Sequence, residues 1–311
     1  MQSAESLRSA RAMTPRSHLA PTARLASLLL CVLPGALLAQ EDEDEEPHIA
    51  DNSFLIEEAF NQEQGVVQHI FNWVPSWGRV RGVRQNAFGF VFTQEWPVLS
   101  QTHQFSYTIP VLYSAERAGG DLAEAQGFGD LFLNYRLQVF DGENAPIALA
   151  PRFSVILPTG DEAEGLSLGR LGYQVNLPFS KETEHWAFHF NAGLTHVPGV
   201  TVGVSPELPF EGRDLSGYNL GASAIYYLRP DLNLMLESLA LWDQELLPDG
   251  SKDHLFQMFL SPGFRWAPYT EGDTQWVVGV GLPIGLTRDT PDISLFLYMS
   301  FEHRVGKKRG S

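Results

Sequence analysis

The chain contains a single cysteine, Cys31, so no disulfide can form within it. Cys31 lies in the first 39 residues, and the remaining chain therefore has no thiolate metal site either. No apolar run after those residues reaches the roughly 20 residues that a membrane-spanning helix needs. Positive charge is scarce as well, because 21 Lys and Arg stand against 37 Asp and Glu and leave a net charge of −16. This balance argues against a nucleic-acid partner.

Residues 1–39 have the three parts of a secretory signal peptide. Four arginines precede an apolar stretch over 25–38, and Ala39 supplies the small residue before the predicted cut. Leu30 stands where a lipoprotein signal needs a small residue before Cys31, so lipidation is not expected. Four Arg and one Glu give this segment a charge of +3, and its removal leaves the exported chain near −19.

Both ends of the exported chain carry charge runs. Residues 40–50 begin with QEDEDEEPH, and like charges in series repel one another and bury nothing, so we expect an acidic disordered leader. A calcium site is the less favoured alternative, because no Gly or Asn imposes a loop geometry on the run. The last residues, GKKRGS over 306–311, predict a basic tail.

Between these ends the sequence alternates with a period of two, which is the pattern of strands with two different faces. In GFGDLFLNYRLQVF, for example, Leu131 and Leu133 fall on one face, and Asn134 and Arg136 on the other. The pattern predicts about twelve strands, near 66–74, 86–96, 102–113, 127–140, 147–157, 171–179, 185–196, 217–228, 232–242, 254–266, 275–286 and 293–304.

Short and long connections alternate between these strands: PVLSQ, DGENAP and RPD are short, whereas PSWGRVRGVRQ and TGDEAEGLSLGR are long. Tight periplasmic turns and longer extracellular loops are typical of membrane β-barrels, and an even strand number places both termini in the periplasm. Tryptophans at strand ends resemble an aromatic girdle: Trp96, Trp186, Trp242, Trp266 and Trp276. We therefore predict an all-β fold, a transmembrane antiparallel barrel of about 12 strands over 66–305, rather than a soluble sandwich.

Four segments also resemble a known family: DNSFLIEEAFNQEQGVVQHI, GFGDLFLNYRLQ, PRFSVILPTGD and GYQVNLPFS. They are similar to bacterial outer-membrane β-barrel transporters related to the phenol degradation meta-pathway outer-membrane family. The resemblance implies an outer-membrane barrel, assembled by the barrel-assembly machinery, with no substrate-defining motif. One departure is at the C-terminus, where such chains usually end on an aromatic residue and this one continues past SFEHRV; Phe301 is the nearest substitute.

The stretch before the first strand, 51–65, predicts a short helix at the periplasmic mouth. Asp51, Asn52 and Ser53 are good N-cap residues and Gly65 is a suitable stop, so the helix would run over 54–61. A helix this short is not stable alone in water, and its apolar side chains must pack against another surface. We predict that these side chains plug the barrel: Phe54, Leu55 and Phe60.

Charged and polar residues of the predicted inward faces are the candidates for transport chemistry: Glu95, Asp130, Arg136, Arg152, His185, His189, Glu237, Arg265 and Glu302. An arginine on the lipid face at the membrane midplane costs about 2–4 kcal/mol, which favours the inward assignment. Arg136 and Arg152 come from strands joined by a short turn and should lie close, paired with Asp130 or Glu95. These charges would set selectivity or form a plug of salt bridges; equally, they would only neutralise one another.

Three arginines, Arg79, Arg81 and Arg84, cluster in the first predicted long loop of an otherwise acidic protein. Guanidinium groups bind phosphate in bidentate fashion, so lipopolysaccharide at the outer surface is a natural partner. A solvated loop is the simpler interpretation.

The leading functional hypothesis is passive uptake of a small solute by a barrel in contact with outer-membrane lipid. In the narrower form of this hypothesis the solute is aromatic or apolar. Room in the lumen is suggested by Phe132 and by three glycines of one strand face, Gly279, Gly281 and Gly285. A closed barrel with a structural or surface-interaction role is the second hypothesis.

A membrane-embedded hydrolase is the third hypothesis, and we expect no enzyme. The elbow-like run Gly165–Gly169 contains Ser167 but lacks a strand–turn–helix frame, and His189 with Asn191 falls on a polar strand face. No phosphate loop, zinc spacing or dinucleotide fingerprint is present, so no metal or cofactor is predicted.

Overall fold

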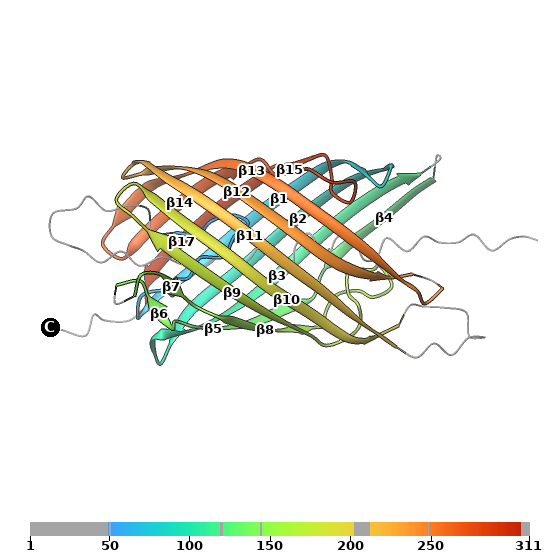
Figure 1. Ribbon diagram of the computed structural model, residues 1–311, viewed down its shortest axis with the longest axis horizontal. Coiled ribbons are helices and arrows are strands. Elements are labelled where there is room, and N and C mark those ends of the chain that lie inside the picture. Colours follow the sequence, from blue (N-terminus) through green and yellow to red (C-terminus); the bar gives the residue numbers. More distant parts are fainter. Residues whose placement is uncertain are drawn as a thin grey trace, which may run out of the picture.

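The alternating segments close into an antiparallel β-barrel whose strands run obliquely to its long axis (Figure 1). The computed structural model describes residues 49, 51–118, 121–143, 145–201, 212–247 and 249–305. The predicted signal peptide and basic tail, and all of the acidic leader except Ile49, lie outside these residues.

Seventeen strands are assigned within the described ranges. In chain order they are β1 (Val66–Val80), β2 (Val83–Val98), β3 (Ser100–Ala118), β4 (Asp121–Phe128), β5 (Leu131–Leu137), β6 (Phe140–Asp141), β7 (Ala148–Leu149), β8 (Arg152–Leu157), β9 (Gly172–Glu182), β10 (Trp186–Val200), β11 (Arg213–Arg229), β12 (Leu232–Leu246), β13 (Lys252–Glu271), β14 (Thr274–Gly281), β15 (Ile284–Gly285), β16 (Ile293–Ser294) and β17 (Phe296–Arg304).

These strands occupy twelve positions in the wall of the described barrel, as predicted. Four positions are shared by two consecutive strands on the same neighbour: β4 and β5 on β3, β7 and β8 on β9, β14 and β15 on β13, and β16 and β17 on β1. The short β6 pairs with β7 in the connection between β5 and β8. The barrel closes where β1 pairs with β17, from Val66 opposite Arg304 to Trp73 opposite Leu297.

The start of β1 and the end of β17 lie at the same end of the barrel as the short turn β11–β12 (Arg229–Leu232). Short turns face the periplasm in outer-membrane barrels, so we name this end periplasmic and the opposite end extracellular. The predicted long loop over 75–85 is wrong, because β1 and β2 continue to a two-residue turn at Arg81 and Gly82. Both turn residues have positive φ, 51° and 84°, which matches the twist of a hairpin.

Alternation along each strand sorts the side chains as expected from the sequence. On β5, Phe132, Asn134 and Arg136 are buried inside the barrel, while Leu133 and Tyr135 between them face outward. The outer face is apolar: Phe190 and Leu220, for example, are each 53% exposed. Four of the five predicted girdle tryptophans, all but Trp96, are at least 40% exposed near strand ends. Such a surface suits lipid rather than water.

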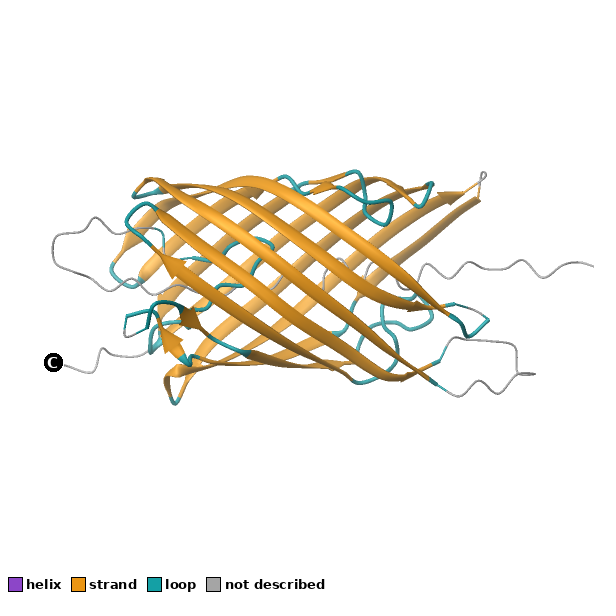
Figure 2. Cartoon of the chain, viewed as in Figure 1, coloured by secondary structure: helices purple, strands orange, loops and turns teal. Residues whose placement is uncertain are grey.

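The predicted helix over 54–61 is wrong. Those residues form bends and extended chain, and no helix is assigned anywhere in the described ranges (Figure 2). Consequently, none of the described residues belongs to a helix long and apolar enough to cross a membrane.

Candidate functional site

The chain before β1 lies inside the barrel (Figure 1), and every residue from Asp51 to Gln62 is buried. We call residues 51–62 the inserted segment. It joins β1 through a turn in which the amide of Val66 donates to the carbonyl of Glu63 at 3.0 Å, with Gly65 at φ 87°. Phe54, Leu55 and Phe60, the predicted plug residues, are all buried within it.

Side chains of the barrel wall satisfy the backbone of the inserted segment. One carboxylate oxygen of Glu237 on β12 accepts from the amides of Phe54 (3.0 Å) and Leu55 (2.9 Å). Other wall groups accept from further amides of the segment: Asn191 from Glu57, Ser180 from Ala59, Gln138 from Asn61 and Gln104 from Gln62, all at 2.7–2.8 Å. Buried amides need partners, and here the wall supplies them in place of helical carbonyls.

The predicted capping side chains are bonded to the wall as well, which explains why no helix forms. The hydroxyl of Ser53 lies 3.0 Å from the hydroxyl of Ser223, and the side-chain amide of Asn52 donates to Gln68 at 3.1 Å. Asp51 accepts from the hydroxyl of Tyr298 at 2.5 Å. A short helix gains little by itself, so these tertiary bonds determine the backbone.

Glu57 is the counter-charge of two arginines that face each other on the inner wall. Arg136 and Arg152 are direct register partners on β5 and β8, an arrangement in which like charges repel. Glu57 lies 3.5 Å from Arg136 and 2.9 Å from Arg152, so one carboxylate neutralises both. Arg136 also lies 3.8 Å from Glu95, the partner predicted for it. The plug of salt bridges therefore depends on the inserted segment.

Arg265 on β13 forms the second charged contact with the segment. Its guanidinium lies 3.4 Å from Glu58, donates to the carbonyl of Asp51, and is fully buried. His189 on β10 lies 3.5 Å from the same Glu58 oxygen, and its other ring nitrogen is 2.7 Å from the hydroxyl of Ser180. Two acidic residues that are adjacent in sequence thus contact different sides of the wall.

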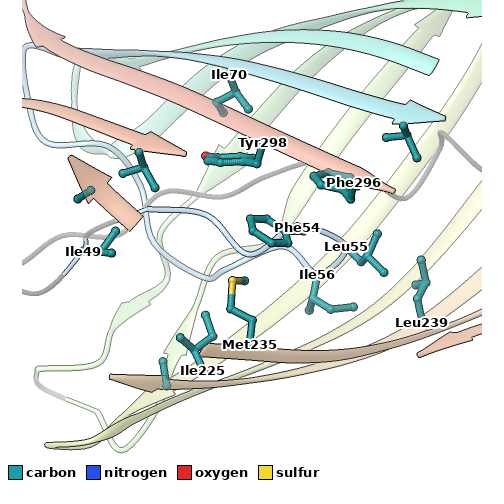
Figure 3. Packing of buried hydrophobic residues seen from close by; sticks show 14 of the residues in the cluster. Ile49, Phe54, Leu55, Ile56, Ile70, Ile225, Met235, Leu239, Phe296 and Tyr298 are labelled. Carbon is teal, nitrogen blue, oxygen red and sulfur yellow. The ribbon is translucent and has the colours of Figure 1, made fainter. Parts of the chain in front are cut away.

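An apolar slot in the wall holds Phe54 (Figure 3). The ring stacks on Phe296 with centroids 5.3 Å apart and an interplanar angle of 18°, and lies 5.4 Å from the ring of Tyr298. Gly279 and Gly281 form the floor, because a Cβ at these positions would stand 2.3 Å and 3.0 Å from atoms of the ring. The space predicted beside these glycines is therefore real, and the chain's own phenylalanine occupies it.

Three of the predicted lumen residues lie away from these contacts. Glu302 on β17 accepts from the side-chain amide of Gln62 at 3.1 Å. Asp130, between β4 and β5, accepts from the amide of Gly160 at 3.1 Å and does not pair with the two arginines as predicted. His185 was assigned inward, and this is wrong: it lies exposed in the β9–β10 turn, because the strand begins only at Trp186.

The acidic residues of the inserted segment, Asp51, Glu57 and Glu58, were missed as site residues. The sequence does contain a signal for them, since three acids stand in a stretch with five apolar residues while three arginines are assigned to inward faces. Matching the two sets would have suggested the pairing, although not which acid meets which arginine.

A second piece of chain enters from the extracellular end. In the loop over 158–171, Leu166 is buried against Leu112 and Ala125 of the inner wall, and Leu168 packs beside a neighbouring cluster. Ser167 of the elbow-like motif accepts from the amide of Gly169 at 2.9 Å, and strand β9 follows the loop. The motif therefore lacks the strand–turn–helix frame of a serine hydrolase.

A cavity of about 610 Å³ opens beside the inserted segment at the periplasmic end. It lies between the connection over 138–148, the start of β3 and the end of β9, with Phe60 of the segment in its wall. Within the described ranges, no three His, Cys, Asp or Glu side chains are grouped so that they could hold a metal ion.

One of three solved structures compared here aligns well enough to support the architecture. The COG4313 outer membrane channel from Pseudomonas putida F1 aligns with a TM-score of 0.60 and 13% identity, covering 78% of this chain and 97% of that one. The translocator domain of the autotransporter NalP from Neisseria meningitidis aligns at 0.47 and 11%, covering 78% and 90%. The toluene transporter TbuX from Ralstonia pickettii aligns at 0.39 and 10%, covering 79% and 90%.

No protein-family model matches the sequence, and no curated protein is similar to it. The expected antiparallel β-barrel fold is thus confirmed, and the Pseudomonas channel shares it over most of its length.

Proposed function

We propose that the chain is an outer-membrane channel for the passive uptake of small solutes. The observation that carries this proposal is how the lumen is filled. Glycines such as Gly221 and Gly279 leave space in the inner wall, and a separate segment of chain fills it. A barrel that only needed a solid core would fill it with wall side chains, whereas a segment can withdraw.

An outer-membrane location is supported by the apolar outer face and by the fold shared with a channel of that membrane. Transport would be diffusion down a gradient. As the inserted segment leaves, the solute would contact the buried charged groups of the wall that the segment had contacted.

The narrower proposal concerns the solute class. The slot around Phe54 is flat, lined by Phe296, Tyr298 and glycine backbone, and holds an aromatic ring in the closed state. When the segment withdraws, the same slot would accept an aromatic or apolar solute of similar size. Stacked aromatic pairs contribute about 0.5–1.5 kcal/mol beyond area burial, enough for weak, reversible binding.

A closed barrel with a structural role is the second candidate, and one observation favours it. The inserted segment is bonded through both its backbone and its charges, as a permanent core would be. The two functions differ in a single property, namely whether the segment leaves its place.

A disulfide lock tests that property, since the exported chain has no cysteine of its own. Ser53→Cys with Ser223→Cys joins the segment to β11 at hydroxyls 3.0 Å apart. Ser76→Cys with Ser294→Cys joins two wall strands at 2.7 Å and is the matched control. Conductance in planar bilayers and uptake of a small aromatic solute by liposomes are measured before and after reduction.

We expect the oxidised segment lock to abolish current and uptake, reduction to restore both, and the wall lock to change neither. Equal current in the oxidised and reduced segment lock would show that the segment does not gate the pore. Absence of current from every form, including the wild type, would favour the structural barrel.

A further inference from the structure

Three arginines lie in one row across the outer face at the extracellular end. Arg79 on β1 is the register partner of Arg84 on β2, which is in turn the partner of Arg117 on β3. Direct partners on adjacent strands have Cβ atoms about 4.5–5.5 Å apart, so the three side chains start within roughly 10 Å. We call these three residues the arginine row. Arg117 is distant from the others in sequence and joins them only through the register of β2 and β3.

The row points away from the lumen. All three side chains are exposed. The neighbouring residues on the same strands point inward: the side-chain amide of Gln85 donates to Glu116 at 3.0 Å. Trp77 lies one outward position nearer the membrane on β1 and is 45% exposed, at the level where aromatic girdles meet the headgroups. The row therefore stands just above the girdle, at the height of the outer-leaflet headgroups.

The charges of the row are not neutralised by the described chain. No side-chain hydrogen bond or ion pair joins the guanidinium of Arg79, Arg84 or Arg117 to another described residue. One acid of this end, Glu124, accepts from the hydroxyl of Tyr113 at 2.8 Å. Like charges directly opposite one another destabilise a sheet, so the row favours an external anion.

Arg81, which the sequence groups with Arg79 and Arg84, does not belong to the row. Its guanidinium donates to Asp253 and Asp289 and to the carbonyl of His254, and it is only 20% exposed. The guanidinium of Arg81 is therefore engaged within the chain, and Arg117 takes its place beside Arg79 and Arg84.

We propose that the arginine row binds the phosphate groups of lipopolysaccharide in the outer leaflet. Arginine forks match phosphate oxygens in bidentate geometry, and several charge-assisted bonds to one phosphorylated headgroup remove the mutual repulsion of the row. The membrane lipid is the favoured source of phosphate because the row lies beside the girdle, outside the lumen. The proposal rests on the outer-membrane location and is independent of channel activity.

The test compares two triple variants of the full exported chain. Arg79→Gln, Arg84→Gln and Arg117→Gln remove the row. The control triple removes three other arginines of the extracellular end, Arg170, Arg213 and Arg288, which do not form a row, so its charge change is the same. Lipopolysaccharide retained through purification in mild detergent is quantified, and binding is titrated with vesicles containing diphosphorylated or dephosphorylated lipid A.

We expect the row variant to lose at least tenfold in affinity for diphosphorylated vesicles, and the control triple to keep the wild-type affinity. None of the proteins should bind dephosphorylated vesicles. Equal losses in both triples would reduce the effect to net charge and overturn the site. Displacement of the lipid by millimolar inorganic phosphate would overturn the lipid as its ligand. Conductance of the row variant is recorded separately, so a failed channel proposal does not affect this result.

Discussion

Two pieces of the same chain enter the barrel from opposite ends, and they are held in different ways. The inserted segment is buried at every residue from Asp51 to Gln62 and is fixed by ion pairs and backbone hydrogen bonds. In the loop over 158–171 only residues 165–167 are buried, and Leu166 and Leu168 supply its apolar contacts. Local opening requires less free energy where few contacts are broken. The extracellular loop should therefore open often, and the periplasmic segment rarely and as a unit.

The largest effect is expected from Glu57→Gln, because it leaves Arg152 without a counter-charge, opposite an Arg136 that keeps only Glu95 at 3.8 Å. Breaking a buried ion pair from one side costs about 3–5 kcal/mol. We expect the segment to dissociate from the wall and bilayer conductance to rise. Glu184→Gln, in the exposed β9–β10 turn, is the control. Unchanged conductance and unchanged urea unfolding in vesicles would contradict the role of Glu57.

The next effect concerns the slot, where Phe54 and Gly279 are probed as a pair. Phe54→Ala should lower the free energy of unfolding by about 3 kcal/mol through the cavity it leaves. Gly279→Ala should also destabilise, because its Cβ would stand 2.3 Å from the Phe54 ring. In the Phe54→Ala background the added methyl still meets the carbonyl oxygen of Phe264 at 3.1 Å, but it should cost much less, a coupling of about 0.5–3 kcal/mol. Additive effects in this double-mutant cycle would disprove the contact.

A smaller and more local effect is expected at the extracellular loop. Leu166→Ala removes its contacts with Leu112 and Ala125 and should weaken the docking of the loop by roughly 2 kcal/mol. The loop should become more sensitive to protease while the urea midpoint of the barrel hardly moves. Leu171→Ala, at an exposed leucine that begins the next strand region, should leave cleavage unchanged. A global loss of stability would show that the loop is part of the core.

The smallest effect is a pH dependence at the β1–β2 turn. Partial burial opposes ionisation of Asp289, but the hydrogen bond and charge of Arg81 outweigh it and hold the pKa of Asp289 below its usual value. A lowered pKa stabilises the fold above pH values near 4 and loses this contribution as pH falls through the folded pKa. A partly exposed pair contributes about 0.2–1 kcal/mol. Asp289→Asn should make the free energy of unfolding, measured in vesicles, fall less steeply as the pH is lowered into the acidic range. An unchanged pH dependence would contradict the pairing.

The barrel and the two faces of its wall follow from local sequence patterns. Period-two alternation is a local property, so it correctly predicted that Glu95, Arg136, Arg152, Glu237 and Arg265 face inward. A separate argument, that a short helix is unstable alone, predicted that the stretch before β1 must bury its apolar side chains. His185 shows the limit of such patterns, because a face assigned near a strand end depends on where the strand begins.

Which groups meet depends on how the closed barrel brings distant residues together. The segment over 54–61 has helix-capping residues before it, yet it forms no helix, because wall groups such as Glu237 and Asn191 bond its amides. Arg117 joins Arg79 and Arg84 through strand register, and Phe54 fills the space beside Gly279. Periodicity reports the face on which a side chain lies. Its partner is set by contacts between distant parts of the chain, which the barrel creates only when it closes.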